Sequence, residues 1–177
     1  KLSADRLKLL EEVERRACLF FYEQAHPVTG LVLDRVRVDG LDDRRAASIA
    51  ATGFGLSALC IAHERGYLKR DMAEERVERT LEFFARRAFS QKGFYFHFLD
   101  CVTGEREFEC ELSSIDTTWL LCGVLHARQH FDTRRIRKLA NEILGRVEWS
   151  WMMAGGETLC HGWTPENGFL PFRWDEY

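Results

Sequence analysis

Two acidic side chains stand at the start of the most distinctive segment of this chain, Glu111-Leu-Ser-Ser-Ile-Asp-Thr-Thr118. Glu111 and Asp116 lie close together in sequence, and the residues that follow are nearly uncharged. Cleavage of a glycosidic bond uses a pair of carboxyl groups: one protonates the leaving oxygen, and the other activates water or attacks carbon. The segment is therefore the first candidate for a polysaccharide-cleaving site.

An altered copy of this segment lies 66 residues upstream. When residues 48–59 are aligned with residues 114–125, Ser, Ile and Leu stay in step. The first copy has Arg45 and Ala50 where the second has Glu111 and Asp116. Repeats of this length indicate helical arrays or closed rings, and acids present in only one copy indicate a site.

Composition excludes several classes of function. The 177 residues are 46% hydrophobic and 30% charged, which describes one globular domain large enough to bury a core. The net charge of -3 gives no basic surface, so no nucleic-acid partner is expected. The longest apolar run, residues 46–62, is shorter than the roughly 20 residues that cross a bilayer, so no membrane span is expected.

Five helices are predicted, and two kinds alternate. The second and fourth are apolar on nearly every face, whereas the others carry one apolar stripe. This alternation predicts an all-α fold, the N-terminal part of an (α/α)6 toroid, with inner and outer helices. The expected helices cover residues 4–24, 45–65, 70–89, 114–130 and 133–153.

Three long connections, residues 29–35, 93–100 and 161–169, follow the outer helices and so lie on one face, where functional residues collect. The middle one alternates like a strand and is expected to form a short β-hairpin with residues 105–109.

Each candidate acid also has a structural interpretation. Asp116 fits a capping box with Ser113, Glu111 could be a solvated loop acid, and Glu166 lies in a turn-forming sequence. Glu166 is nevertheless favoured as general acid, because neighbouring Trp, Pro and Phe residues should desolvate it and raise its pKa. Asp116 should stay ionised at a helix start and suits a base or sugar-hydroxyl role, and Glu111 would position substrate or share the base role. The weaker acidic candidates are Asp34, Asp100, Asp175 and Glu176.

Histidines and aromatic residues extend this face. His97 and His161 fall in equivalent connections, and a hydrogen-bonded structural histidine is the common alternative. Aromatic side chains there are either sugar platforms or core lids. The substrate-binding candidates are Asp34, Arg35, His97, Asp100, His161, Trp163 and Trp174.

Cysteine and histidine spacing predicts no metal. None of the six cysteines forms a CxxC pair, although Cys101 and Cys110 flank the hairpin and could bridge. His63, His126 and His130 lack a spacing with acids that would predict a ligand set.

Several motifs in order resemble the bacterial glucoamylase-like (glycoamylase) family. They are the segments 48–59, 64–66, 93–100, 111–117 and 162–166, which extend over essentially the whole chain. That family includes endo-β-1,2-glucanases and is related to a domain of cyclic β-1,2-glucan synthases.

The resemblance implies inverting hydrolysis of a β-glucan, β-1,2-glucan above all, without a metal or organic cofactor, and a periplasmic or secreted location. It implies an oligo- or polysaccharide as the binding partner. Because a full toroid needs more helices, residues 1–177 are expected to be a partial domain, truncated at the C-terminus, with the rest of the toroid missing. Two alternatives stay open: a non-catalytic glycan-binding toroid and a structural helical repeat.

Overall fold

The computed structural model describes residues 2–40 and 43–175. Its helices are α1 (Ala4–Glu23), α2 (Ile49–Glu64), α3 (Arg70–Arg86), α4 (Ser114–Phe131), α5 (Arg134–Leu144) and α6 (Trp149–Met152). Its short strands are β1 (Ala46–Ser48), β2 (Ser90–Gln91), β3 (Phe94–Tyr95), β4 (Phe98–Asp100), β5 (Leu112–Ser113), β6 (Gly162–Thr164) and β7 (Gly168–Phe169).

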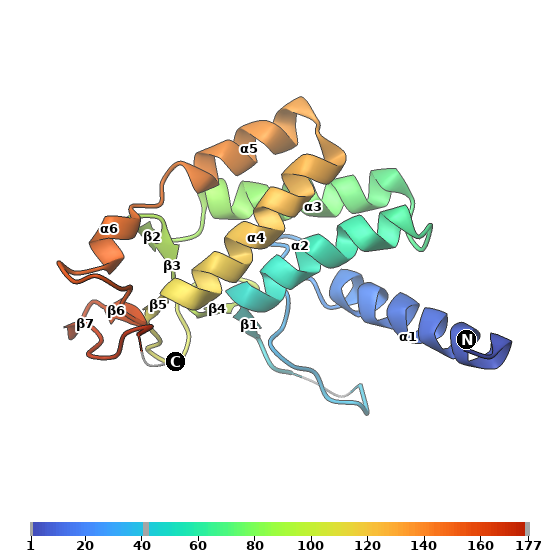
Figure 1. The fold of residues 1–177 in the computed structure, drawn as a ribbon, viewed down its shortest axis with the longest axis horizontal. Coiled ribbons are helices and arrows are strands. Elements are labelled where there is room, and N and C mark those ends of the chain that lie inside the picture. Colours follow the sequence, from blue (N-terminus) through green and yellow to red (C-terminus); the bar gives the residue numbers. More distant parts are fainter. Residues whose placement is uncertain (1, 41–42, 176–177) are drawn as a thin grey trace.

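Helices α2 and α4 form the inner pair that the sequence predicts. They cross the centre of the molecule side by side, with α1 against α2 and with α3 and α5 together on the other side (Figure 1). Gly53 and Gly123 meet where the inner helices cross, and a Cβ at Gly53 would lie 2.6 Å from the Leu120 Cα. The outer helices keep their charged residues at the surface, as exposed Lys138 on α5 shows. The fold is therefore part of a helical toroid.

Capping side chains fix where the helices begin. Ser3, Ser48, Ser113 and Thr133 each accept a hydrogen bond from a backbone N–H in the first turn of α1, α2, α4 and α5. Such caps satisfy amides that would otherwise lack a partner.

The strands gather at the end of the inner pair where α2 and α4 begin (Figure 1). Antiparallel β1 and β4 pair there, and β5, β6 and β7 form a second small sheet. The predicted β-hairpin is confirmed: the Asp100 N–H donates to Glu105 O and the Glu107 N–H donates to Phe98 O. The strands bring the three long connections to one face.

Two helix predictions are wrong in their bounds. The helix expected over residues 45–65 starts only at Ile49, because Ala46–Ser48 pairs with β4. The helix expected over residues 133–153 is broken after Leu144, and α6 begins at Trp149. Between them the Glu148 N–H donates to Lys92 O, so tertiary hydrogen bonding replaces the helical pattern.

All six cysteines are free thiols, so the bridge considered between Cys101 and Cys110 does not form. Among the described residues, no helix is both long and apolar enough to cross a membrane.

Candidate active site

Backbone pairing brings the middle connection against the start of α4. The His97 N–H donates to Glu111 O at 3.0 Å, and Phe96 and Leu112 form an antiparallel bridge. On the other side, the Ile49 N–H donates to His97 O at 3.2 Å. His97 is thus held between the beginnings of both inner helices, beside the segment that carries Glu111 and Asp116.

Side chains complete the His97–Glu111–Asp116 cluster. His97 Nδ1 lies 3.3 Å from Glu111 Oε1, and His97 Nε2 lies 3.5 Å from Asp116 Oδ1. One nitrogen or oxygen from each of the three side chains falls within 4.8 Å of the others. Asp116 is the least exposed, at 13%, while Glu111 and His97 are about a quarter exposed. The two acids predicted from the sequence therefore converge, with the predicted histidine between them.

Two neighbours orient the cluster. The Ser113 hydroxyl donates to Asp116 Oδ2 at 2.5 Å and accepts from the Asp116 N–H at 3.2 Å. The Phe98 ring stacks on His97, with centroids 3.8 Å apart and planes 16° from parallel. Ser113 therefore caps α4, as predicted. The Asp116 carboxylate in turn accepts a hydrogen bond from the Ser113 hydroxyl.

Protonation in the cluster reflects burial against charge. Burial of the imidazole favours its neutral form, but the hydrogen bond to Glu111 and the charge of Asp116 outweigh it and raise the pKa of His97. Burial likewise favours a neutral Glu111, but the His97 hydrogen bond outweighs it and lowers the pKa of that carboxyl group. Both shifts favour the form of the pair in which His97 carries the proton and Glu111 is ionised.

Glu166 differs from the expectation. It lies in the turn between β6 and β7, its side chain is 52% exposed, and it forms a two-pronged ion pair with Arg106, at 2.6 and 3.1 Å. The hydrogen bond from Arg106 lowers the pKa of Glu166, so the predicted rise is wrong. The Trp, Pro and Phe neighbours in sequence do not enclose the carboxylate.

A pocket of about 490 Å³ opens next to Phe98. Asp34 and Arg35 line it and form an ion pair at 2.7 Å. Arg45 lines the same pocket and binds Asp100 at 2.7 Å. This pocket brings two of the predicted substrate-binding residues to the side of the cluster that Phe98 covers.

The remaining candidates are placed as follows. His161 stacks on Trp174 with centroids 4.0 Å apart, and Trp174 Nε1–H donates to Ser114 Oγ. Trp174 lines a second pocket of about 340 Å³ beside the start of α4. Trp163 is half-buried on β6 and packs toward Trp151.

Of the three other candidate acids, Asp100 and Asp175 form hydrogen bonds within the fold. Asp100 is 8% exposed, and its carboxylate accepts from the Val102 and Thr103 N–H groups as well as from Arg45. The Thr158 hydroxyl donates to Asp175 at 3.3 Å. Glu176 lies outside the described residues.

Sequence reasoning missed two kinds of contact. Arg106 lies opposite Leu99 in the hairpin and pairs with Glu166 in the β6–β7 turn, and no local sequence signal indicates this contact between residues 60 positions apart. It also missed the nearness of His63, Glu64 and His130, whose ligand atoms lie within 4.8 Å of one another. The spacing of these histidines in sequence does not predict a ligand set, and their nearness arises because α2 packs against α4.

No protein-family model matches the chain. The chain is 30% identical, over 179 aligned residues, to the exo β-1,2-glucooligosaccharide sophorohydrolase (non-reducing end) of Parabacteroides distasonis. The solved endo-β-1,2-glucanase of Chitinophaga pinensis, in complex with sophorotriose and glucose, superimposes with a TM-score of 0.81 at 28% identity. The chain is thus similar, in sequence and in fold, to part of each of these two β-1,2-glucan hydrolases. A β-1,2-glucanase of P. distasonis also superimposes, with a TM-score of 0.76 at 25% identity.

These matches extend over nearly all of this chain but only part of each relative. The sophorohydrolase alignment covers 92% of the chain and 24% of that protein. The two solved structures are matched over 96% and 95% of the chain, and over 44% and 25% of their own lengths. The resemblance to a glucoamylase-like family that includes β-1,2-glucanases is confirmed for the fold of the described residues.

Proposed function

We propose that the protein containing this chain is a glycoside hydrolase that cleaves a β-glucan, with β-1,2-glucan as the favoured substrate. The observation that carries the proposal is the His97–Glu111–Asp116 cluster at the connection face, because two carboxylates around one proton carrier suit acid/base cleavage. The names of the relatives supply the substrate class.

In this proposal Glu111 is the general acid. The free site holds His97 and Glu111 as an ion pair. When a sugar covers the site and expels water, the neutral forms gain over the charged ones, and the proton passes from His97 Nδ1 to Glu111. Glu111 then protonates the leaving oxygen, while the neighbouring Asp116 side chain stabilises the positive charge that develops on the sugar ring.

The base is proposed to come from another part of the toroid. Inverting hydrolases hold their two carboxyl groups roughly 6.5–9.5 Å apart to admit a water molecule. Oxygens of Glu111 and Asp116 lie within 4.8 Å of each other, which is too close for that water. Since the chain spans less than half of its solved relatives, the activating carboxylate is expected from the part that it does not span.

Substrate contacts are proposed for the two pockets beside the cluster. Asp34 and Arg35 would bind sugar hydroxyls in the larger pocket, where Phe98 and the exposed Phe108 give apolar surface. Trp174, with His161 stacked against it, would form the wall of the smaller pocket. Trp163 is proposed to support this wall rather than to contact sugar, because it is half-buried against Trp151.

The alternative is a toroid that binds glycan without cleaving it, and one assay separates the two. The full-length protein is incubated with linear β-1,2-glucan, and new reducing ends are measured for the parent, Glu111→Gln, Asp116→Asn and Glu166→Gln. Hydrolysis by the parent, with severe loss in the first two variants only, supports the proposal. Saturable glucan binding without new reducing ends in the parent would establish the binding module instead.

A further inference from the structure

A second cluster lies at the opposite end of the inner helices. His63 and Glu64 are at the end of α2, and His130 is at the end of α4. Asp116 and His130 are 14 positions apart on α4, which corresponds to about 21 Å along the helix axis. This cluster is therefore separate from the candidate active site.

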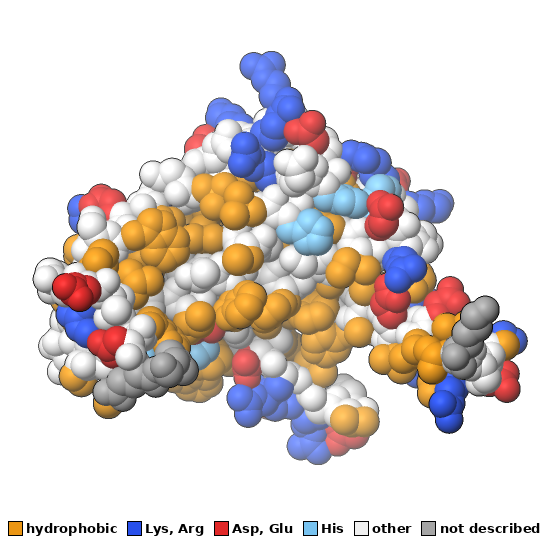
Figure 2. Space-filling view, viewed as in Figure 1, with side chains coloured by type: hydrophobic (Ala, Val, Ile, Leu, Met, Phe, Trp, Pro, Cys, Tyr) orange, Lys and Arg blue, Asp and Glu red, His pale blue; other side chains and the backbone are white. Residues whose placement is uncertain are grey.

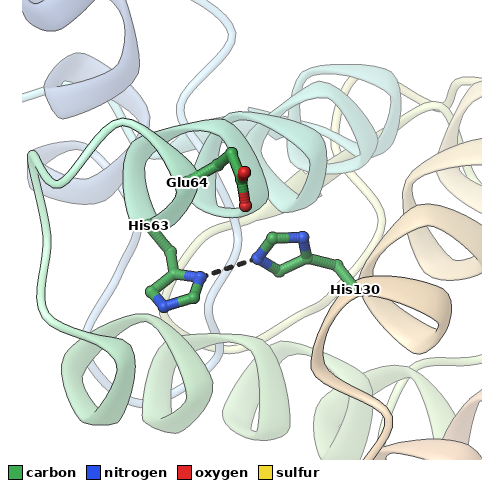
Figure 3. A group of neighbouring side chains, drawn as sticks. All are labelled: His63, Glu64 and His130. Atoms are coloured by element: carbon green, nitrogen blue, oxygen red, sulfur yellow. Dashed lines mark hydrogen bonds between the residues drawn. The ribbon is translucent and has the colours of Figure 1, made fainter.

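The geometry of the cluster is that of a ligand set. His63 Nδ1 lies 2.8 Å from His130 Nε2, and the two rings are 78° from coplanar. The Glu64 carboxylate points toward the imidazole pair (Figure 3). A ligand atom from each of the three residues falls within 4.8 Å of the others. Two imidazole nitrogens and one carboxylate oxygen match the donors of many three-residue zinc sites.

We propose that His63, Glu64 and His130 bind a divalent transition metal ion of the Zn²⁺ class and that the ion cross-links the ends of α2 and α4. Tetrahedral zinc with bonds of 2.0–2.1 Å holds two nitrogens about 3.3 Å apart. The imidazoles therefore need to separate by about half an ångström from their present hydrogen-bonded distance and to turn so that both nitrogens face the ion.

Proton bookkeeping is simple in this site. In the neutral pair one imidazole donates its N–H to the other. On metal binding the donating ring keeps its proton but carries it on its other nitrogen, so both facing nitrogens become ligands.

The surroundings favour an ion with an open coordination position. The centroid of the Phe131 ring lies 4.7 Å from that of His130 and 5.8 Å from that of His63, so an apolar ring packs against both imidazoles. In front, a pocket of about 400 Å³ is lined by Glu64, His126 and His130. His126 stands one helical turn before His130, so water or His126 could complete the coordination sphere.

This inference does not depend on hydrolase activity, and its test measures binding and stability. The full-length protein is freed of metal with a chelator and titrated with Zn²⁺ alone, while Tm and calorimetric affinity are recorded. Co²⁺ is then used as a spectroscopic probe, because its visible absorption distinguishes tetrahedral from octahedral coordination. A saturable one-to-one site with a rise in Tm is expected.

Variants locate the ion. Exposed Glu64→Gln and half-buried His130→Gln should each weaken Zn²⁺ affinity by at least about tenfold, since even loss of an outer partner has an effect of that size. Glu111→Gln and His161→Gln should leave the affinity unchanged. The proposal is overturned if the parent shows no saturable binding, if Glu64→Gln binds as the parent does, or if Glu111→Gln alone removes the site.

Discussion

His97 lies between two carboxylates, and each of the three groups alters the protonation of the others. The raised pKa of His97 and the lowered pKa of Glu111 define a pH window in which the pair is ionic. Above that window His97 is neutral, and below it Glu111 is protonated. At the scale of the residue, this coupling is what makes the cluster a candidate for proton transfer.

The pH dependence of stability should follow from these two shifts. His97 stabilises the fold fully below its unfolded pKa of about 6.5, and the contribution is lost as pH rises through its raised folded value. Glu111 stabilises the fold above its unfolded pKa of about 4.5, and that contribution is lost as pH falls through its lowered folded value.

His97→Gln should therefore lower the free energy of unfolding between these limits and flatten its decline on the alkaline side. Urea unfolding of the full-length protein at a series of pH values measures both effects, with His161→Gln as the matched control. An unchanged alkaline slope in His97→Gln would show that the histidine is not held as an ion.

Kinetics should separate Glu111 from Glu166. Glu111→Gln removes the proposed proton donor, so kcat on β-1,2-glucan should fall by at least about 100-fold, the lower range of a general acid's contribution. Glu166 is 52% exposed and paired to Arg106, so Glu166→Gln should keep kcat within a few-fold of the parent. Near-normal turnover by Glu111→Gln would show that Glu111 is not the general acid. Loss of turnover in Glu166→Gln alone would assign that role to Glu166.

The contrast between these two acids shows how far sequence reaches at the residue scale. Glu111 and Asp116 were predictable because they flank a capped helix start and appear in only one of two repeats. The lowered pKa of Glu166 was not predictable, because its partner Arg106 stands 60 residues away in sequence. Neighbours in sequence such as Trp163 and Pro165 show only that apolar residues are near Glu166 along the chain. Whether they bury its carboxylate depends on the direction in which the β6–β7 turn projects it.

At the scale of the element, the contact of α2 with α4 depends on two glycines. A Cβ at Gly123 would lie 2.7 Å from the Gly53 carbonyl carbon, which is backbone and cannot rotate away. The close approach brings the beginnings of both helices to His97 and their ends to the His63–His130 pair.

Gly123→Ala should therefore destabilise the protein although alanine is the better helix former. Overpacking typically costs about 1–3 kcal/mol, and the gain in helix propensity returns at most about 1 kcal/mol. Because the added Cβ would meet backbone atoms, the cost should lie at the upper end of that range, and we expect a net loss of about 2 kcal/mol in urea unfolding. Exposed Cys122→Ala, on the same helix, is the control and should change the value by less than about 0.5 kcal/mol. Equal stability of both variants would contradict the close crossing.

Helix bounds show the limit of prediction at this scale. Hydrophobic periodicity predicted the inner helices correctly because α2 and α4 are apolar on nearly every face. It extended the second helix over Ala46–Ser48 because an apolar run reads alike as buried helix or strand. It missed the break after Leu144 because the competing hydrogen bond, from Glu148 to Lys92, joins residues distant in sequence.

At the scale of the whole molecule, the inner helices carry large apolar side chains at the surface. Phe54, Trp119 and Leu125 are 48%, 43% and 46% exposed, and the Phe54 and Trp119 rings lie 5.1 Å apart. Figure 2 shows apolar side chains gathered over α2 and α4 on the face in view. Monomers rarely expose more than a few hundred Å² of contiguous apolar surface.

The remainder of the toroid is proposed to cover this face, as the partial coverage of the relatives suggests. The 177-residue chain alone should then bind a dye for apolar surface or self-associate. Phe54→Ser with Trp119→Ser should reduce dye fluorescence and association while far-ultraviolet circular dichroism stays unchanged. Val28→Ser removes an exposed apolar side chain elsewhere and should reduce neither. If the chain is instead a monodisperse monomer that binds no dye, this apolar face does not require a covering partner. The proposal that the rest of a toroid packs on it would then be wrong.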